Sequence, residues 1–365
     1  MTVIATFGFP DHPMAFGDML VSGPERTDRK IGIPSIGDVT NFFPEGSGWS
    51  ITGLAQKLVI VSDECVVGWA GSQLGARMAI HDLRSLASSE RLTPASIRHF
   101  LDNMNVDTRN LGTSLLGLLR TDAGFERFAF DPSCEATMLD GTPVTLAGSG
   151  ANTIAKFLST SRRTRLRQDD SAVHPAEKAY ELGLQIAGVH LRMEEAHDAQ
   201  LLQYFGGLYE VAVFNGERFT KDLGVTYVLW EGKDPDANGF SRPSHIITTN
   251  YFDDVLVFRS QKLVWKEGTT FVAGDLQVHS ISPIYGRTDP SFRPTPAMVV
   301  QQTPWTCHCF LTRRSNGSIR QLAIVQRPNY DGSDNFSIEA REGIVVKVNW
   351  KKQFWEDLQF AIEVD

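Results

Sequence analysis

The order of strand-like and helix-like segments constrains the fold of this chain most. Up to about residue 219, the pattern predicts strands at 2–9, 14–22, 57–61 and 65–70, and helices at 73–86 and 93–105. Strands at 113–120, 125–131, 136–139 and 144–147, helices at 151–159 and 175–197, and a strand at 209–214 follow. Hairpin turns join antiparallel strands, so this order favours two sheets sandwiched between helical layers over a parallel doubly wound sheet.

The last third of the chain has a different texture. Short β-branched and aromatic runs at 224–230, 254–259 and 343–350 alternate with turn-rich segments such as 233–239. We therefore predict two domains, 1–219 with mixed structure and 220–365 with mostly β structure. Four tryptophans in the second part, Trp265, Trp305, Trp350 and Trp355, are expected in its core because strands bury such side chains.

Composition and charge exclude several classes of protein. Hydrophobic residues make up 42% and charged residues 21% of the 365, which is typical of a globular chain. The net charge of −8 makes nucleic acid a poor default partner, and the basic run 162–167 is interpreted as a solvated linker. No apolar run is long enough to cross a membrane, and residues 1–10 lack the features of a signal peptide. We expect a cytoplasmic protein with no membrane partner.

Two segments contain residue types that can bind a metal ion, but their spacing argues against a metal site in each. The four cysteines are too few for a disulfide framework, and Cys307-His308-Cys309 is interpreted as ordinary strand sequence. Residues 193–198 contain one histidine among several acidic residues, without a second histidine at helical spacing. A charge cluster at a helix end is the better interpretation, and we expect neither a metal nor a cofactor.

The second residue carries the first candidate for chemistry. Thr2 follows Met1, and its side chain is small enough that removal of the initiator methionine is expected. A threonine hydroxyl is a weak nucleophile without an adjacent base. An N-terminal threonine has such a base in its own α-amine, with an ordinary pKa of about 7.7–8.0. Thr2 alone could therefore form a minimal nucleophile and base pair.

Four motifs accompany Thr2 along the chain. Residues 2–5 form an opening strand, and residues 16–23 contain Asp18 and Ser22. A strand beginning with Lys57 follows, and then a glycine-containing turn with Gly71, which is 14 residues after Lys57. In these motifs the chain up to about residue 215 resembles the proteasome-type N-terminal-threonine hydrolases, namely the proteasome β-subunits and their bacterial ring-forming relatives. The resemblance implies a four-layer α/β/β/α sandwich of the N-terminal nucleophile (Ntn) hydrolase type.

The resemblance also implies a role for each matched residue. Lys57 would lower the cost of deprotonating the Thr2 hydroxyl, and Asp18 would keep Lys57 charged and oriented. The backbone N–H of Gly71, expected at a helix start, would stabilise an oxyanion, and Ser22 would contact the substrate. Each has a plainer alternative: Asp18 as a turn residue, Lys57 as a solvated strand start, and Gly71 as a helix N-terminal glycine.

Ser149 completes the matched set. It lies in Gly148-Ser149-Gly150, similar to a family loop whose serine lies beside the threonine amine and orients proton transfer. Capping the following helix is an alternative role for Ser149. A phosphate-binding loop is disfavoured because no Lys-Ser or Lys-Thr follows.

The chain departs from the family in three places. Leu202 and Phe205 stand where the family has an aspartate and a serine after its long helix, and Asp198 could replace the carboxylate only if the helix end is shifted. The segment 23–53 is longer than the family connection, and Leu20 stands where a basic residue is common.

We therefore expect an N-terminal-threonine hydrolase that cleaves peptide or other amide bonds, forms a homo-oligomer, and could work with an ATPase partner. A non-catalytic ring-forming relative and a small-molecule amidase, its site closed by the C-terminal domain, are the alternatives.

Overall fold

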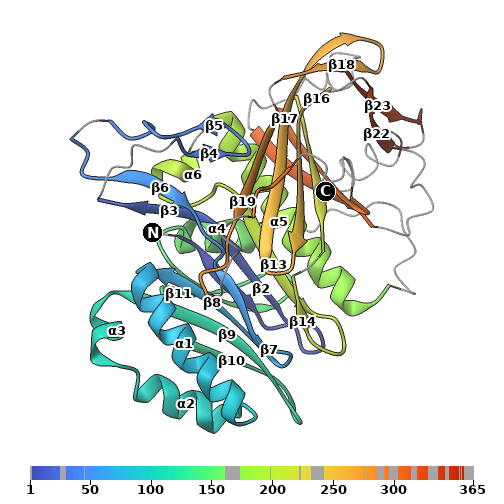
Figure 1. Ribbon diagram of the computed structural model, residues 1–365. Helices are drawn as coiled ribbons and strands as arrows, with labels where there is room; N and C mark the ends of the chain where they lie inside the picture. Colours follow the sequence, from blue (N-terminus) through green and yellow to red (C-terminus); the bar gives the residue numbers. More distant parts are fainter. Residues whose placement is uncertain are drawn as a thin grey trace.

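The computed structural model has mixed α and β structure in which strands predominate (Figure 1). It describes residues 2–24, 30–44, 46–160, 173–197, 199–221, 223–231, 242–274, 276–285, 292–295, 303–313, 319–327, 336–341, 345–352, 354 and 356. The basic run 162–167, the turn-rich segment 233–239, Asp198 and Trp355 lie outside these residues. Within them, no helix has the length and apolarity needed to span a membrane.

The first sheet contains both ends of the N-terminal part. Its strand order is β11-β12-β1-β2-β13-β14, and every neighbouring pair is antiparallel. The strands are β1 (Ile4–Phe7), β2 (Met14–Asp18), β11 (Cys134–Thr137), β12 (Pro143–Ala147), β13 (Tyr209–Phe214) and β14 (Phe219–Thr220). β1 lies at the centre, so the residue just before it is surrounded by chain from several elements.

The second sheet packs against the first. Its order is β10-β9-β8-β7, with strands β7 (Leu58–Ser62), β8 (Cys65–Gly71), β9 (Thr113–Thr121) and β10 (Gly124–Phe130). β8 and β9 contact β1 and β2 of the first sheet, whereas helix α1 (Gln73–Ser89) covers β7, β8 and β9. Helices α2 (Pro94–Asp102) and α3 (Val106–Asn110) lie beside β10 and β9. The helix predicted at 93–105 is present but shorter: it ends at Asp102, and Asn105 caps the separate helix α3.

The strand predicted at 14–22 is also broken. β2 ends at Asp18, and β3 (Leu20–Gly23) leaves the first sheet to pair with β6 (Ser50–Leu54). The amide of Met19 donates to the carbonyl of Leu208 at 3.0 Å, and its carbonyl accepts from Ala55 at 2.8 Å. These long-range bonds turn the backbone. The segment 23–53 also contains β4 (Gly32–Ile33) and β5 (Gly37–Asp38).

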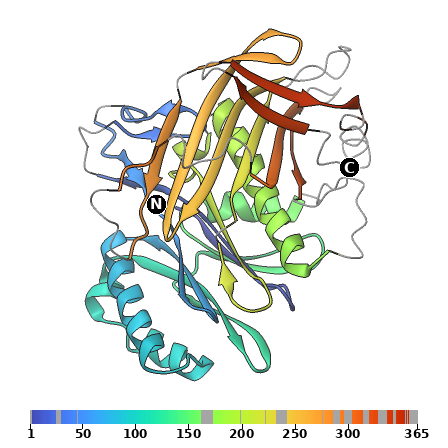
Figure 2. The same ribbon diagram turned by 45° about the vertical axis from the view of Figure 1, so that its right-hand side comes forward.

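The remaining helices cover the other face of the first sheet. α4 (Ala151–Thr160) contacts β11 and β12, and α5 (Pro175–His197) contacts β2 and β13; the short α6 (Ala199–Leu202) follows. α5 also contacts β20 and β21 of the C-terminal sheet, so this helix lies between two sheets (Figures 1 and 2).

The C-terminal sheet is long and curled. Its order is β21-β20-β15-β16-β17-β18-β23-β22, with β19 paired to β17; β15 and β20 are parallel. The strands are β15 (Val225–Trp230), β16 (Pro243–Phe252), β17 (Val255–Glu267), β18 (Thr270–Ala273), β19 (Gln277–Ile281), β20 (Trp305–Arg313), β21 (Ile319–Gln326), β22 (Phe336–Arg341) and β23 (Val345–Trp350). Cys307 and Cys309 are strand residues of β20, as predicted, and both thiols are free.

The tryptophan prediction is confirmed in part. Trp305 is buried and Trp350 packs against the core, but Trp265 is 45% exposed near the end of β17. The guanidinium of Arg242 lies 3.6 Å from its ring centroid. The sequence pattern predicts a strand but does not indicate that the last residues of β17 are exposed.

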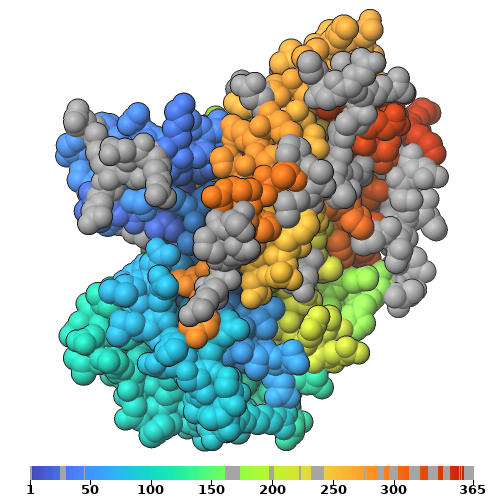
Figure 3. Space-filling model, in the orientation of Figure 1, coloured from blue at the N-terminus to red at the C-terminus, as the bar shows by residue number. Residues whose placement is uncertain are grey.

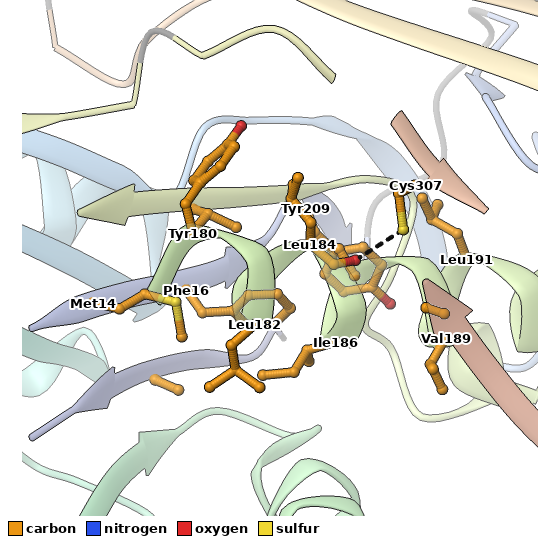
Figure 4. Packing of buried hydrophobic residues seen from close by; sticks show 14 of the residues in the cluster. Met14, Phe16, Tyr180, Leu182, Leu184, Ile186, Val189, Leu191, Tyr209 and Cys307 are labelled. Atoms are coloured by element: carbon orange, nitrogen blue, oxygen red, sulfur yellow. Dashed lines mark hydrogen bonds between the residues drawn. The ribbon is translucent and has the colours of Figure 1, made fainter. Parts of the chain in front are cut away.

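One hydrophobic cluster joins the two halves of the chain. It includes Phe16 and Tyr209 of the first sheet, side chains along α5, and Tyr227 and Cys307 of the C-terminal sheet. Figure 4 shows Met14 and Phe16 beside Leu182, and Cys307 beside Leu184. Elsewhere, Tyr285 packs on α1 through a contact with His81, and Figure 3 shows C-terminal atoms in orange directly against the N-terminal part. The two halves therefore share a core.

Two glycines allow α5 to approach both sheets closely. A Cβ on Gly183 would lie 2.5 Å from Val211, and a Cβ on Gly188 would lie 2.6 Å from the Cys307 Sγ. Glycine costs about 1 kcal/mol relative to alanine in a helix interior, so close packing is the physical reason for these glycines.

We predict that Gly188→Ala lowers the free energy of unfolding by about 1–3 kcal/mol, because the added methyl overpacks the contact with Cys307 and Cys309. Urea unfolding measures the change. In a helix free of this contact, the same substitution would stabilise the protein by about 1 kcal/mol. A gain in stability would therefore contradict the packing of α5 on the C-terminal sheet.

Candidate active site around Thr2

The side chain of Thr2 is fully buried beside Asp18. Thr2 lies two residues before β1, and its hydroxyl donates a hydrogen bond to Asp18 Oδ1. The amide of Val3 donates to the same oxygen at 2.9 Å, and the amide of Gly206 donates to Oδ2 at 2.8 Å. Asp18 is the last residue of β2 and is itself fully buried, and its carboxylate joins three separate parts of the chain.

The loop 148–150 holds the backbone of Thr2. The amide of Gly150 and the hydroxyl of Ser149 donate to the carbonyl of Thr2 at 3.2 and 3.4 Å. Gly148 has a φ of +97°, and a Cβ there would lie 2.1 Å from the Thr2 carbonyl oxygen. Only glycine fits this position without displacing Thr2. Helix α4 begins after this loop at Ala151, and the described bond of Ser149 goes to Thr2 rather than to the helix.

Lys57 is only 1% exposed, and its ammonium group interacts electrostatically with Asp18. The alternative of a solvated strand start is therefore wrong. Its Nζ lies 3.9 Å from the ring centroid of Trp69, and its stem passes Gly17, where a Cβ would lie 3.1 Å from Lys57 Cβ. A cation over an indole face is favourable in a desolvated site. Lys57 directly precedes β7 and Trp69 lies in β8, so one antiparallel strand pair brings the ammonium and the indole ring together.

Burial shifts the titration of both charged groups. It raises the pKa of Asp18 from 3.8 to about 6, against the attraction of Lys57 and the hydrogen bonds from Thr2, Val3 and Gly206. It lowers the pKa of Lys57 from 10.5 to about 8, against the attraction of Asp18 and Glu210. Both pKa values move toward neutrality, which is typical of groups that exchange protons near neutral pH.

Gly71 and Ser22 lie in strands of two different sheets, β8 and β3. Gly71 is the exposed last residue of β8, opposite Thr113 in β9, with a φ of +83°. Helix α1 begins at Gln73, as predicted, and Ser72 is its N-cap, so Gly71 lies one residue before the cap. Ser22 is half-buried in β3, and within the described part of the chain its hydroxyl has no hydrogen-bond partner.

Two consecutive backbone amides that follow Phe205 each bind a buried carboxylate. Gly206 donates to Asp18, and Gly207 donates to Glu194 Oε2 at 2.7 Å; both glycines have positive φ. Leu202 is 61% exposed, whereas Phe205 is fully buried against Gly150. A backbone turn therefore supplies one donor to Asp18, from Gly206, and one to Glu194, from Gly207.

Glu194 is a buried residue of the site that the sequence analysis missed. It lies near the end of α5, is fully buried, and accepts a hydrogen bond from the hydroxyl of Ser35 as well as from Gly207. Ser35 belongs to the long segment 23–53, which this bond ties to α5. No local signal could have linked two residues 159 positions apart.

The comparisons with known proteins give no family assignment. No protein-family model matches the chain, and no curated protein matches it. Within the described residues, no group of three or more His, Cys, Asp or Glu side chains is placed to hold a metal ion. The functional proposal must therefore rest on the geometry around Thr2.

The raised pKa of Asp18 gives a pH-dependent contribution to stability. The folded chain holds this proton more tightly than the unfolded chain, so the contribution is fully present below about pH 3.8 and is lost as the pH rises through about 6. We predict that the free energy of unfolding of the native protein falls by on the order of 3 kcal/mol, relative to Asp18→Asn, from about pH 4 to about pH 7. Urea unfolding across this range measures it, and a constant difference would contradict burial of a titrating Asp18.

Proposed function

We propose that this protein is an N-terminal-threonine amide hydrolase of the peptidase type, active after removal of Met1. The observation that carries the proposal is the hydroxyl of Thr2 bonded to buried Asp18, which interacts electrostatically with buried Lys57. Two sheets packed face to face, with helices on the outer face of each, also support the four-layer Ntn arrangement.

The proposed reaction proceeds through an ester. The α-amine of mature Thr2 takes the proton from its own hydroxyl, and Oγ1 attacks the carbonyl carbon of the substrate amide. The leaving amine takes that proton as the C–N bond breaks, which leaves the acyl group as an ester on Thr2. Water then attacks the ester, releases the acid and restores the hydroxyl. Positive charge on Lys57 favours the deprotonated hydroxyl, and the amide of Gly71 is the proposed oxyanion donor.

The loop 148–150 supports this mechanism in a second way. Ser149 and Gly150 hold the Thr2 carbonyl, which fixes the backbone from which both the amine and the hydroxyl project. A nucleophile and its base must be held in one geometry for efficient transfer. Assembly into a homo-oligomeric ring, a role for Ser22 in substrate contact, and an ATPase partner are further parts of the proposal.

One observation favours a second candidate, a non-catalytic relative that keeps the fold. Thr2 is fully buried and its hydroxyl already donates to Asp18, so in this arrangement the pair also serves as a structural anchor. Leu202 and Phe205, in place of an acidic and a hydroxyl residue, agree with that candidate. The two functions differ in whether Thr2 reacts with an electrophile.

We predict that the purified protein lacks Met1 and gains one adduct with an electrophile selective for N-terminal threonine, as measured by intact mass. Thr2→Ser should retain the adduct, whereas Thr2→Ala should lose both the adduct and the hydrolysis of an unfolded polypeptide. Retained Met1, or a free Thr2 that never labels, would exclude the hydrolase and favour the non-catalytic relative. Faster cleavage of small amides than of polypeptide would identify a small-molecule amidase.

We predict a bell-shaped dependence of kcat/KM on pH. Activity declines toward acid as the α-amine, with an ordinary pKa of about 7.7–8.0, and then Asp18, with a pKa of about 6, take up protons. Activity declines above about pH 8 because Lys57 loses its charge. Steady-state rates across this range measure both limbs. A rate that stays constant well above pH 8 would show that a charged Lys57 is not required.

A further inference from the structure

A buried carboxylate supports the backbone of Lys57 from behind. Glu210 lies in β13, and its side chain has no exposed surface. Its Oε2 accepts hydrogen bonds from the amides of Lys57 at 2.6 Å and Leu58 at 3.1 Å. Two amides on one carboxylate oxygen fix the start of β7, and hence the point from which the Lys57 side chain leaves.

The other oxygen of Glu210 faces the C-terminal half. Oε1 accepts from Lys221 Nζ at 3.0 Å and from the Tyr251 hydroxyl at 2.9 Å. Tyr251 lies in β16 of the C-terminal sheet, and Lys221 is a buried residue that follows β14. Lys221 Nζ also donates to the Leu58 carbonyl at 2.9 Å. The carboxylate therefore has four donors, one of them a cation.

Gln56 makes a second connection on the other side of Lys57. It is fully buried, and its Nε2 donates to the carbonyls of Asp254 and Ile281 at 2.7 Å each. Its Oε1 accepts from Lys221, and its own carbonyl accepts from Trp69 Nε1 at 2.9 Å. Residues on both sides of Lys57 are therefore bonded to groups of the C-terminal sheet or to Lys221.

We propose that the C-terminal half is a working part of the Thr2 site, which holds Lys57 in position through a buried network of Gln56, Glu210, Lys221 and Tyr251, with Glu210 as the central positioning residue. The inference rests on the proposed function. It assigns a role to residues beyond 220, for which the sequence offers no resemblance.

The network also acts through charge. The charged groups that face Lys57 are Asp18 of β2 and Glu210 of β13, and both favour its ammonium form. Glu210 in turn faces Lys221 and the hydroxyl of Tyr251. A cationic partner and further hydrogen-bond donors stabilise a buried carboxylate, and removing one member of such a pair leaves a buried charge without its partner. Removing the charge of Glu210 should therefore weaken the ammonium form of Lys57.

The test is Glu210→Gln in the full chain. Glutamine keeps the size of the side chain and an acceptor oxygen, but it has no charge. We expect the alkaline limb of kcat/KM to move to lower pH, and kcat near pH 8 to fall about tenfold. KM should change less than about twofold, because Glu210 is buried behind Lys57 and touches no substrate.

Glu181→Gln is the matched control. Glu181 forms another buried ion pair, with Arg327, where α5 meets the C-terminal sheet. This variant should lose stability without moving the alkaline limb. If both variants lose stability and neither changes the pH profile, Glu210 has only a structural role and the proposal fails.

A readout independent of hydrolysis separates this proposal from the proposed function. Lysine labelled with ¹³C at Cε reports the titration of Lys57 by NMR, with Lys57→Met identifying its signal. In Glu210→Gln, the pKa of Lys57 should lie below its native value of about 8, whether or not Thr2 reacts. An unchanged pKa would overturn the role of Glu210, and an inactive native protein with a shifted pKa would overturn only the hydrolase.

A milder variant keeps the test decisive if Glu210→Gln does not fold. Tyr251→Phe removes one hydrogen bond from the C-terminal sheet to Glu210 and keeps the ring. We expect kcat to fall about two- to threefold with KM unchanged. A native kcat in this variant would contradict the participation of the C-terminal half.

Discussion

The buried carboxylate of Asp18 is the constraint on which the rest of the site depends. A carboxylate without water is costly unless donors surround it, and here the hydroxyl of Thr2 and the amides of Val3 and Gly206 supply them. These donors come from the start of β1 and from the turn after α6. The hydrogen bonds to Asp18 therefore connect three parts of the chain: the residues before β1, the end of β2 and the turn at Gly206.

Apolar packing along α5 explains how the two halves of the chain form one body. α5 is buried along most of its length between the first sheet and the C-terminal sheet, and glycines on it permit close approach on both sides. Besides this apolar cluster, two hydrogen bonds join the halves: Glu210 accepts from the Tyr251 hydroxyl, and Gln56 donates to the carbonyl of Asp254. Glu210 thus fixes the backbone at Lys57 by accepting hydrogen bonds, as Asp18 does at Thr2 and Val3.

Much of the first part of the fold could be predicted because its signals are local. Helices α4 and α5 and strand β13 begin at residues 151, 175 and 209, where the pattern places them. The break after Asp18 could not be predicted, since the bonds of Met19 to Leu208 and Ala55 carry no local signal. Trp265 was misplaced because aromatic content indicates a strand without indicating which part of it is covered.

By itself, the sequence determined most of the helices and strands, and its resemblance to a known family nominated Thr2, Asp18 and Lys57 as candidate site residues. Only the tertiary structure decided that Asp18 is buried against Thr2, that Lys57 is buried as well, and that burial moves both pKa values toward neutrality. It alone decided that Ser35 would meet Glu194, and that Tyr251 and Lys221 would meet Glu210. The physical reason is that desolvation and long-range hydrogen bonds depend on which distant segments pack together, whereas turns, caps and periodicity depend on neighbours along the chain.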